Sequence, residues 1–336
     1  MPRGAATGAL SLSVTLSFFT ATLAAWRASH ADRCGEMAPP PEAVVKVSIR
    51  AVEGARSADT LGSEREGTGI VVGERGLILT IGYLLIEAAS VLVMTHDGRV
   101  YPGAVAGFDH ATGFGLLRAP ALPAAPVTFG DAAALQELHR VAIVGHAAAG
   151  GASEAAVVSR RRFVGWWEYM LDEAVYTAPA RSDHSGAGLF DESGKLVGIG
   201  SLWVGDALEI GAAFPGNMFV PVNLLEPILD DLVATGRRRG PQRPWLGVYT
   251  EQQEGHVLVS RVLPGSPAAG CGLERGDVIL GIGGHAISGQ AEFYEHLWTR
   301  CATGMEMSLH VLHDKQVKEL RARPMDRLEY FRPWTY

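Results

Sequence analysis

Cysteine, clustered histidine and excess positive charge are scarce in this chain, and each shortage excludes a class of protein. The three cysteines lie at positions 34, 271 and 301, too few for a disulfide-stapled scaffold and without the paired spacing of a zinc site. The 11 histidines are dispersed and form no HExxH motif, so we expect neither a metal nor another cofactor. A net charge of −7, from 29 basic and 36 acidic residues, disfavours nucleic acid as a partner.

Long apolar segments are missing except near the N-terminus. Residues 9–26 carry no charge and follow Arg3, and small residues at positions 29 and 31 suit cleavage after Ala31. We expect residues 1–31 to be a secretory signal peptide, or an uncleaved membrane anchor, because the run just reaches spanning length. Both alternatives predict export, to the periplasm or anchored and facing the periplasm or exterior. The membrane would then be touched only by an uncleaved N-terminal segment.

The rest of the 336 residues is long enough for roughly two ordinary domains, and a hydrophobic content of 47% supports packed cores. A Pro-rich stretch, residues 32–42, is expected to be a linker. Short Val/Ile/Leu-rich runs separated by turn residues then predict a β-barrel or sandwich; they cover residues 43–49, 69–72, 77–80, 90–95 and 141–144.

The second half changes character after residue 222. Apolar residues at helical spacing predict a helix over residues 223–236, capped by Asn223 and ended by Gly236. We expect this helix to close a first domain at residues 43–236. The four arginines of residues 237–243 indicate a solvated hinge. A second domain is expected at residues 244–323, with a helix over 290–300, followed by an aromatic C-terminal tail, residues 324–336.

A distinctive series of motifs runs through both predicted domains. They are, in chain order, Gly67 to Val72, Gly76 to Thr80, Ser185-Gly186, Gly194 to Ile199, Phe219 to Asn223, Arg243 to Val248, Pro264 to Ala268 and Gly272 to Ile279. With its motifs in this order, the chain resembles the HtrA/Deg family of trypsin-like serine proteases, and the resemblance covers residues 43–323. It implies a mainly β protein, in which a trypsin-like double β-barrel domain precedes a small α+β PDZ domain.

The resemblance also shows which catalytic residues are replaced. The family places its histidine base three residues after a strand-ending threonine, and here Thr80 is followed by Tyr83 at that position. A phenol with a reference pKa near 10 is a poor base near pH 7. The orienting aspartate is replaced by Gly113, and the nearest aspartate, Asp109, lies four residues upstream.

The family's catalytic serine is retained in this chain, but a neighbouring residue of its motif is replaced. Ser185 stands where the family has its catalytic serine, but Asp183 replaces the glycine whose N–H helps to bind the oxyanion. Loss of one triad member typically costs about 10⁴-fold or more in rate. We therefore expect Ser185 to be vestigial. The alternative is an active serine endopeptidase in which His110 or His184 serves as a rearranged base.

The PDZ-like domain keeps its binding motif. By resemblance, the backbone N–H groups of Leu246, Gly247 and Val248 would receive the terminal carboxylate of a peptide added as a β-strand. Phe293 and Leu297 would line the groove, or would simply pack the small domain. We therefore expect the partners to be peptides or unfolded polypeptides, including C-terminal tails.

Three further features leave alternatives open. The aromatic segment from Trp166 to Tyr169 indicates either a contact patch or core packing. An extended-peptide cleft could run beside residues 217–220. Whether Cys271 and Cys301 form a disulfide cannot be read from their positions.

These observations together predict an exported HtrA-like pseudoprotease. It would act as an adaptor, a chaperone-like factor or a regulator of an active HtrA-type relative in protein quality control. The alternatives are the active endopeptidase and a purely structural subunit of an envelope assembly.

Overall fold

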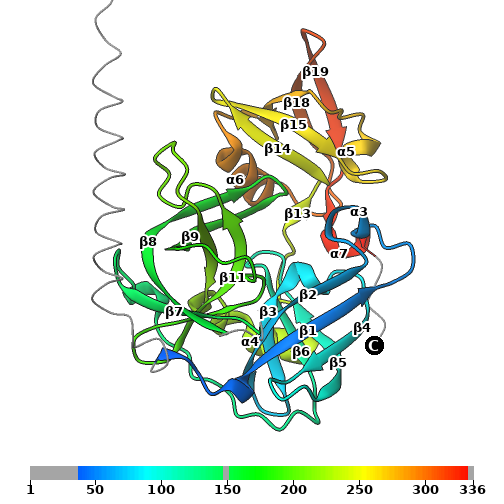
Figure 1. Ribbon diagram of the computed structural model, residues 1–336. Helices are drawn as coiled ribbons and strands as arrows, with labels where there is room; N and C mark the ends of the chain where they lie inside the picture. The colour runs from blue at the N-terminus through cyan, green and yellow to red at the C-terminus, as the bar shows by residue number, and fades with distance from the viewer. Residues whose placement is uncertain (1–36, 147–150, 332–336) are drawn as a thin grey trace, which may run out of the picture.

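The computed structural model describes residues 37–146 and 151–331, which form two closed β-barrels and a smaller sheet domain (Figure 1). The predicted signal segment and Cys34 lie outside the described residues. The expected linker reaches into them, and its end forms a short 3-10 helix, Pro41–Ala43. In the described part of the chain, no helix is long and apolar enough to span a membrane.

The first barrel is built from six antiparallel strands in the order β1-β2-β3-β6-β5-β4. Its strands alternate between core and surface because successive side chains of a strand point to opposite faces. In β1, for example, Val45, Val47 and Ile49 are buried, whereas Lys46 and Ser48 are partly exposed. The strands are β1 Val44–Ala51, β2 Glu64–Gly73, β3 Leu77–Ile81, β4 Ala88–Met94, β5 Val100–Phe108 and β6 Phe114–Arg118. A helix, α3 Ala58–Leu61, and a 3-10 helix, η2 Gly82–Leu85, lie on its connections.

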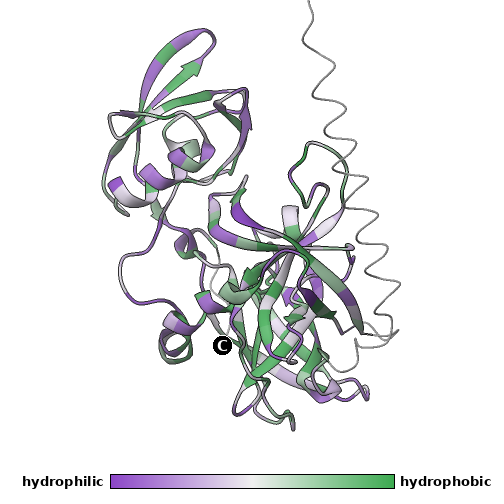
Figure 2. Cartoon of the chain, turned by 90° about the vertical axis from the view of Figure 1, so that its left-hand side faces the viewer, coloured by the Kyte–Doolittle hydropathy of each residue, from purple (hydrophilic) through white to green (hydrophobic). Residues whose placement is uncertain are grey.

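The second barrel has the strand order β10-β11-β12-β9-β8-β7. Its strands are β7 Arg140–Val144, β8 Ala152–Gly165, β9 Tyr169–Ala178, β10 Gly188–Phe190, β11 Leu196–Val204 and β12 Gly216–Pro221, preceded by the 3-10 helix η3 Ala132–Ala134. Figure 2 shows hydrophobic residues concentrated on the strands of the barrels. The β8–β9 hairpin extends from the barrel toward the third domain (Figure 1).

The peptide cleft expected beside residues 217–220 is wrong. Strand β12 pairs with β11 along one edge and with β9 along the other, so neither edge can accept an added strand. All six of its residues are buried.

The third domain follows the two barrels and corresponds to the second domain that the sequence predicts, residues 244–323. It is a five-strand path, β14-β15-β16-β18-β19, packed against one helix, α6 Gln290–Arg300. The predicted helix over 290–300 is confirmed, and Phe293, Tyr294 and Leu297 are its fully buried side chains. The strands are β14 Val248–Gln253, β15 His256–Val262, β16 Val278–Ile282, β17 His285–Ala286, β18 Met307–His313 and β19 Gln316–Ala322, and a short helix α5 Pro267–Gly270 follows β15. Strand β13 Pro244–Trp245 pairs with β20 Met325–Asp326, which leads into α7 Arg327–Tyr330.

The single helix expected over residues 223–236 is three short pieces, because Pro227 interrupts it. They are η4 Val222–Leu224, η5 Glu226–Ile228 and α4 Leu229–Thr235. Asn223 does not cap this segment, since its Oδ1 accepts the N–H of Ala132 instead. Gly236 does end α4, in a left-handed conformation with φ of 76° that favours glycine.

The connector of residues 237–243 is partly to fully exposed along its length, but its arginines are not free. They contact residues of both flanking domains and of α4. Arg237 pairs with Asp326, Arg238 with Asp109 and Arg239 with Asp231, and the Arg243 guanidinium lies over the Trp298 ring.

Candidate functional site

The nucleophile position, Ser185 in the second barrel, and the base position, Tyr83 in the first barrel, lie together. Ser185 is on the loop between β9 and β10, and Tyr83 is on η2, directly after β3. The Tyr83 hydroxyl lies 2.7 Å from Ser185 Oγ and 3.0 Å from the Ser201 carbonyl oxygen, and it can donate its single proton to one of these acceptors at a time. Burial raises the pKa of Tyr83 to about 12, although its hydrogen bond to Ser185 opposes the shift. A phenol that stays protonated near neutral pH is a poor base for the serine hydroxyl.

The loop that carries Ser185 is held by its backbone. The Ser185 carbonyl accepts the N–H of Thr68 at 2.8 Å, and the Gly186 N–H donates to the Gly200 carbonyl at 2.9 Å. Gly186 has φ of 75°, and a Cβ there would lie 2.0 Å from the Thr68 carbonyl oxygen. The position therefore requires glycine on steric grounds alone, independently of any chemistry.

Gly113, at the position of the orienting aspartate, faces an aromatic side chain. The Tyr169 hydroxyl donates to the Thr112 carbonyl at 2.6 Å, and a Cβ on Gly113 would lie 3.0 Å from that hydroxyl. Asp109 does not substitute for the missing carboxylate. It accepts from the N–H and hydroxyl of Thr112 and from the guanidinium of Arg238.

The two histidines considered as a rearranged base are engaged elsewhere. His184 Nδ1 lies 3.2 Å from the Arg181 carbonyl, and the buried His110 ring packs edge-on against Phe108, with centroids 4.3 Å apart. Burial lowers the pKa of both imidazoles, that of His110 well below its ordinary value. Over residues 37–146 and 151–331, no histidine nitrogen is hydrogen-bonded to Ser185 Oγ.

Asp183, at the position of the oxyanion glycine, is a structural residue. Its carboxylate accepts two hydrogen bonds from Arg181, at 2.7 and 2.6 Å, which lower its pKa. The Asp183 side chain also lies against Gly145, where a Cβ would approach Asp183 Oδ2 to 2.6 Å. The side chain is therefore anchored to its own loop.

The carboxylate-binding loop of the third domain already holds a carboxylate, that of Glu168. Its Oε1 accepts the N–H of Leu246 at 2.7 Å, and its Oε2 accepts those of Gly247 at 2.8 Å and Val248 at 3.2 Å. Gly247 permits this arrangement because its φ is 81° and a Cβ there would lie 2.3 Å from Ser266 Cβ. The three N–H groups predicted to bind a carboxylate do so, and the carboxylate comes from the β8–β9 turn.

The rest of the same turn lies between β14 and α6. The Trp166 carbonyl accepts the N–H of Thr250 at 2.8 Å, and the Gly165 carbonyl accepts the Tyr294 hydroxyl at 2.9 Å and Gln290 Nε2 at 3.2 Å. These contacts connect the turn to both walls of the groove.

Phe293 and Leu297 are 0% exposed. They belong to the same hydrophobic cluster as Met170, and Val164 packs against that cluster. Their burial fits the core-packing alternative, and a contact between these two side chains and a peptide stays a prediction.

The segment from Trp166 to Tyr169 combines both alternatives left open by its sequence. Trp166 is 56% exposed, whereas Glu168 and Tyr169 are buried. Trp167 stacks on Tyr169, with ring centroids 5.6 Å apart and planes inclined by 6°. Sequence reasoning missed the role of Glu168. The available signal was one acidic residue among three aromatic ones, in a segment where burial would require a partner.

Glu168 is under electrostatic and conformational constraint. Burial raises its pKa to about 7, although the three N–H groups and, more weakly, Arg327 oppose the shift. Its backbone has φ of 56°, a left-handed conformation that costs a non-glycine residue about 1 kcal/mol or more.

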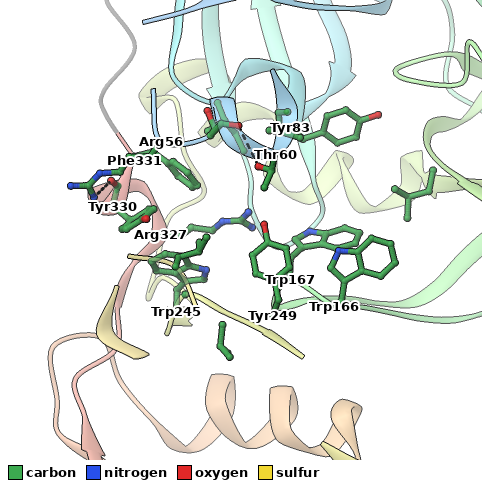
Figure 3. Close-up of a pocket in the computed structure, with 17 residues that line it drawn as sticks. Arg56, Thr60, Tyr83, Trp166, Trp167, Trp245, Tyr249, Arg327, Tyr330 and Phe331 are labelled. Carbon is green, nitrogen blue, oxygen red and sulfur yellow. Dashed lines mark hydrogen bonds between the residues drawn. The ribbon is translucent and has the colours of Figure 1, made fainter. Parts of the chain in front are cut away.

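A cavity of about 320 Å³ lies between the first barrel and the carboxylate-binding loop (Figure 3). Tyr83 and Gly247 both line it, and aromatic side chains form much of its wall. Arg327 projects into this space, as Figure 3 shows, and its Nε is buried without a hydrogen-bond partner in the described structure.

No other cysteine or metal chemistry is found in the described ranges. Cys271 and Cys301 are free thiols, so the disulfide left open by the sequence is not formed. The same residues contain no group of three or more His, Cys, Asp or Glu side chains that could hold a metal ion.

Comparisons with known proteins identify the two domain types. The trypsin-like peptidase domain family matches residues 67–199, and the PDZ domain family matches residues 244–323. The chain therefore contains a trypsin-like peptidase domain followed by a PDZ domain, and its relatives include proteases of the HtrA, DegP and DegS type.

Similar curated proteins are named as proteases. The chain is 26% identical over 257 residues to "Putative serine protease HhoA" of Synechocystis sp., covering 66% of this chain and 61% of that protein. It is 28% identical over 249 residues to "Serine endoprotease DegS" of Haemophilus influenzae, covering 71% of each. The "Probable periplasmic serine endoprotease DegP-like" of Brucella suis is 25% identical over 283 residues. The chain spans 61% of HhoA and 53% of the Brucella protein.

Solved structures share the fold. "HtrA-type protease AlgW with decapeptide" superposes with a TM-score of 0.53 at 20% identity, covering 90% of this chain and 98% of that chain. The predicted order of a double β-barrel domain and a small PDZ domain is confirmed.

Proposed function

We propose that this protein is a non-catalytic member of the HtrA type that captures peptides or unfolded polypeptide segments through its PDZ domain. The observation that carries the proposal is the contact at the nucleophile. The hydroxyl of Tyr83, at the position of the base, donates to Ser185 Oγ at 2.7 Å.

Three features support the absence of proteolysis. The base is a phenol whose pKa is raised to about 12 by burial, so it stays protonated near neutral pH. The orienting position is Gly113, and the Tyr169 hydroxyl lies where a larger side chain would extend. Asp183 is bound to Arg181. An active serine endopeptidase would require a base within about 3 Å of the hydroxyl.

Peptide capture is supported by the state of the carboxylate-binding loop. The N–H groups of Leu246, Gly247 and Val248 converge on one carboxylate with ordinary hydrogen-bond distances, which is the arrangement used for a peptide C-terminus. Structural neighbours titled as HtrA-type proteases with a tripeptide or a decapeptide fit this role.

The proposed cellular role is supported by the names of the relatives and by the N-terminal sequence. Several relatives are named as periplasmic proteases, and the N-terminal segment is typical of export. We therefore place the protein outside the cytoplasm, as an adaptor, a chaperone-like factor or a regulator of an active HtrA-type relative.

The test of inactivity is covalent labelling of the folded full-length protein with a fluorophosphonate probe, which requires an activated serine. We expect no labelling above that of Ser185→Ala, with an active HtrA-type protease as the positive control. Thermal unfolding of both samples verifies that they are folded. Labelling that disappears in Ser185→Ala would contradict the proposal and would show that another group activates the hydroxyl.

A further inference from the structure

The turn between β8 and β9 follows the geometry of a bound peptide. The side-chain carboxylate of Glu168 accepts the N–H of Val248, and the backbone carbonyl of Trp166 accepts the N–H of Thr250. The two contacts follow one another in opposite directions along the turn and β14, which is the order found for an antiparallel peptide. The carboxylate occupies the loop, and a backbone carbonyl two residues earlier pairs with the strand, as in peptide recognition by strand addition.

The other wall of the groove also recognises the turn. The Tyr294 hydroxyl, on α6, donates to the Gly165 carbonyl at 2.9 Å and accepts the Glu168 N–H at 3.1 Å. Gln290 Nε2 contacts the Gly165 carbonyl and the carbonyl of Thr250. Polar groups of both β14 and α6 are therefore satisfied by a segment of the second barrel.

The contact is maintained against a local conformational cost. Glu168 has φ of 56°, where glycine would be favoured. A glutamate at this position brings its carboxylate to the loop, which glycine could not do. The conformational strain, the burial and the three N–H contacts all converge on one residue.

From this geometry we propose that residues 165–168 are a built-in ligand of the PDZ groove, which a C-terminal peptide must displace in order to bind. The inference rests on the proposed function for the nature of the competing partner. The partner is the free C-terminus of an extended polypeptide, because it offers the same carboxylate to Leu246, Gly247 and Val248.

A free peptide has an advantage that the turn lacks. The turn donates or accepts only one backbone hydrogen bond with β14, at Thr250, because it bends back into β9 after Glu168. An extended peptide can continue the strand pairing along β14. The turn is part of the same chain, so its effective concentration at the groove is high. If the turn fills the groove 90–99% of the time, the apparent peptide affinity falls by about 10- to 100-fold.

The first experiment measures the closed state without any peptide. Hydrogen exchange with mass spectrometry would follow the segment that contains Leu246, Gly247 and Val248 in the full chain, in Glu168→Gln and in Glu168→Gly. The glycine variant removes the carboxylate and suits the backbone conformation, so it tests the contact without straining the turn. We expect exchange of this segment to accelerate at least tenfold in both variants.

The matched control is Glu295→Gln. Glu295 Oε1 pairs with Arg162 of β8 at 2.8 Å, so this variant removes a contact between the same hairpin and α6 outside the carboxylate-binding loop. We expect exchange of residues 246–248 in this control to equal that of the wild type. Unchanged exchange in both Glu168 variants, or an equal increase in the control, would overturn the proposal.

The second experiment measures competition. The probe is a fluorescein-labelled hexapeptide, Phe-Val-Gly-Trp-Ala-Val, whose tryptophan carbonyl lies two residues before a free carboxylate, as in the turn. We expect it to bind Glu168→Gln and Glu168→Gly at least tenfold more tightly than the wild type or Glu295→Gln. The same peptide with a C-terminal amide should not bind.

The outcomes separate this inference from the proposed function. Equal, carboxylate-dependent binding to the wild type and both Glu168 variants would overturn the built-in ligand and leave peptide capture standing. Absence of binding to every variant, with exchange accelerated as expected, would contradict peptide capture and with it displacement by a C-terminal peptide.

Discussion

Two inherited sites are occupied by side chains of the chain itself, but in different ways. The first is the nucleophile corner around Ser185, and the second is the PDZ groove between β14 and α6. At the corner, Tyr83 donates to Ser185 from a 3-10 helix that belongs to the first barrel. In the groove, Glu168 reaches the carboxylate-binding loop from the tip of a hairpin of another domain. The occupant of the corner can leave only if a barrel opens, whereas the occupant of the groove can leave by movement of one turn.

The difference suggests that the two inherited sites have separate fates. Under the proposed function, replacement of the base and the orienting residue removes the chemistry, and no described histidine is bonded to Ser185. Occupation of the groove preserves its geometry, since the three N–H groups still converge on a carboxylate. The two proposals together describe a molecule that has lost a reaction centre and kept a binding site under competition.

The contrast between the nucleophile corner and the PDZ groove fails if the loop that carries Ser185 and Gly186 tolerates a larger side chain. Gly186→Ala places a Cβ 2.0 Å from the Thr68 carbonyl oxygen at φ of 75°. We expect a loss of about 3 kcal/mol or more in the free energy of unfolding, from strain and overpacking together, measured by urea denaturation. Gly98→Ala is the control, because its φ is 82° but nothing lies within 4 Å; it should lose only about 1 kcal/mol. Equal losses would mean that the contact with Thr68 is soft.

The groove should respond to pH in a way that the corner does not. The pKa of Glu168 is about 7 in the closed state, and in an open, solvated turn it returns toward its ordinary value. In the closed state, Glu168 therefore holds its proton more tightly than in the open state. The closed state is most stable below the ordinary pKa of a glutamate, and it loses that stability as the pH rises from there through 7. We expect the hexapeptide affinity of the wild type to rise by about 10- to 100-fold from pH 5 to pH 8.

Other groups surround Glu168, and the control removes their contribution. They are Tyr294 on α6 and Arg327 on α7, and across a small cavity Asp109, His110, Arg238, Arg243 and Asp326. Burial keeps His110 neutral, since its pKa lies well below the ordinary value. The affinity of Glu168→Gln should be flat over the same pH range. A parallel rise in both proteins would assign the pH dependence to another group.

A smaller effect is expected from removal of the phenol at the corner. Tyr83→Phe loses hydrogen bonds to Ser185 Oγ and the Ser201 carbonyl, which should cost about 1–2 kcal/mol of unfolding free energy. Ser185→Ala should cost less, because Tyr83 keeps its bond to Ser201. Neither variant should label with a fluorophosphonate or change the hexapeptide affinity. A change in that affinity would show that the corner and the groove are coupled.

The smallest effect is expected at the rim of the hairpin. Arg162→Ala removes ion pairs with Asp172 and Glu295, in which all three side chains are well exposed. Exposed pairs contribute about 0.2–1 kcal/mol, so the unfolding free energy should fall by less than about 1 kcal/mol. A larger loss would mean that the rim, more than Glu168, holds the hairpin on the PDZ domain.

Local signals predicted the short strands, since Val/Ile/Leu runs and turn residues are read from neighbouring positions. The order of a double β-barrel domain and a PDZ domain, the carboxylate-binding loop around Gly247 and the base position at Tyr83 came from the resemblance to the HtrA/Deg family. The sequence did not predict the partner of Glu168 or those of the connector arginines, because these contacts join residues far apart in the chain. Apolar periodicity predicts one helix after residue 222, but it carries no information on the interruption at Pro227.

Glu168 and Tyr169 are consecutive, yet one contacts the carboxylate-binding loop and the other packs beside Gly113. A displacement of the turn that also carries Tyr169 would break the hydrogen bond from its hydroxyl to the Thr112 carbonyl. Opening of the groove would then cost about 1 kcal/mol more than the loss of the Glu168 contacts alone. The closed position of the turn is thus held at two ends, one in the PDZ domain and one in the first barrel.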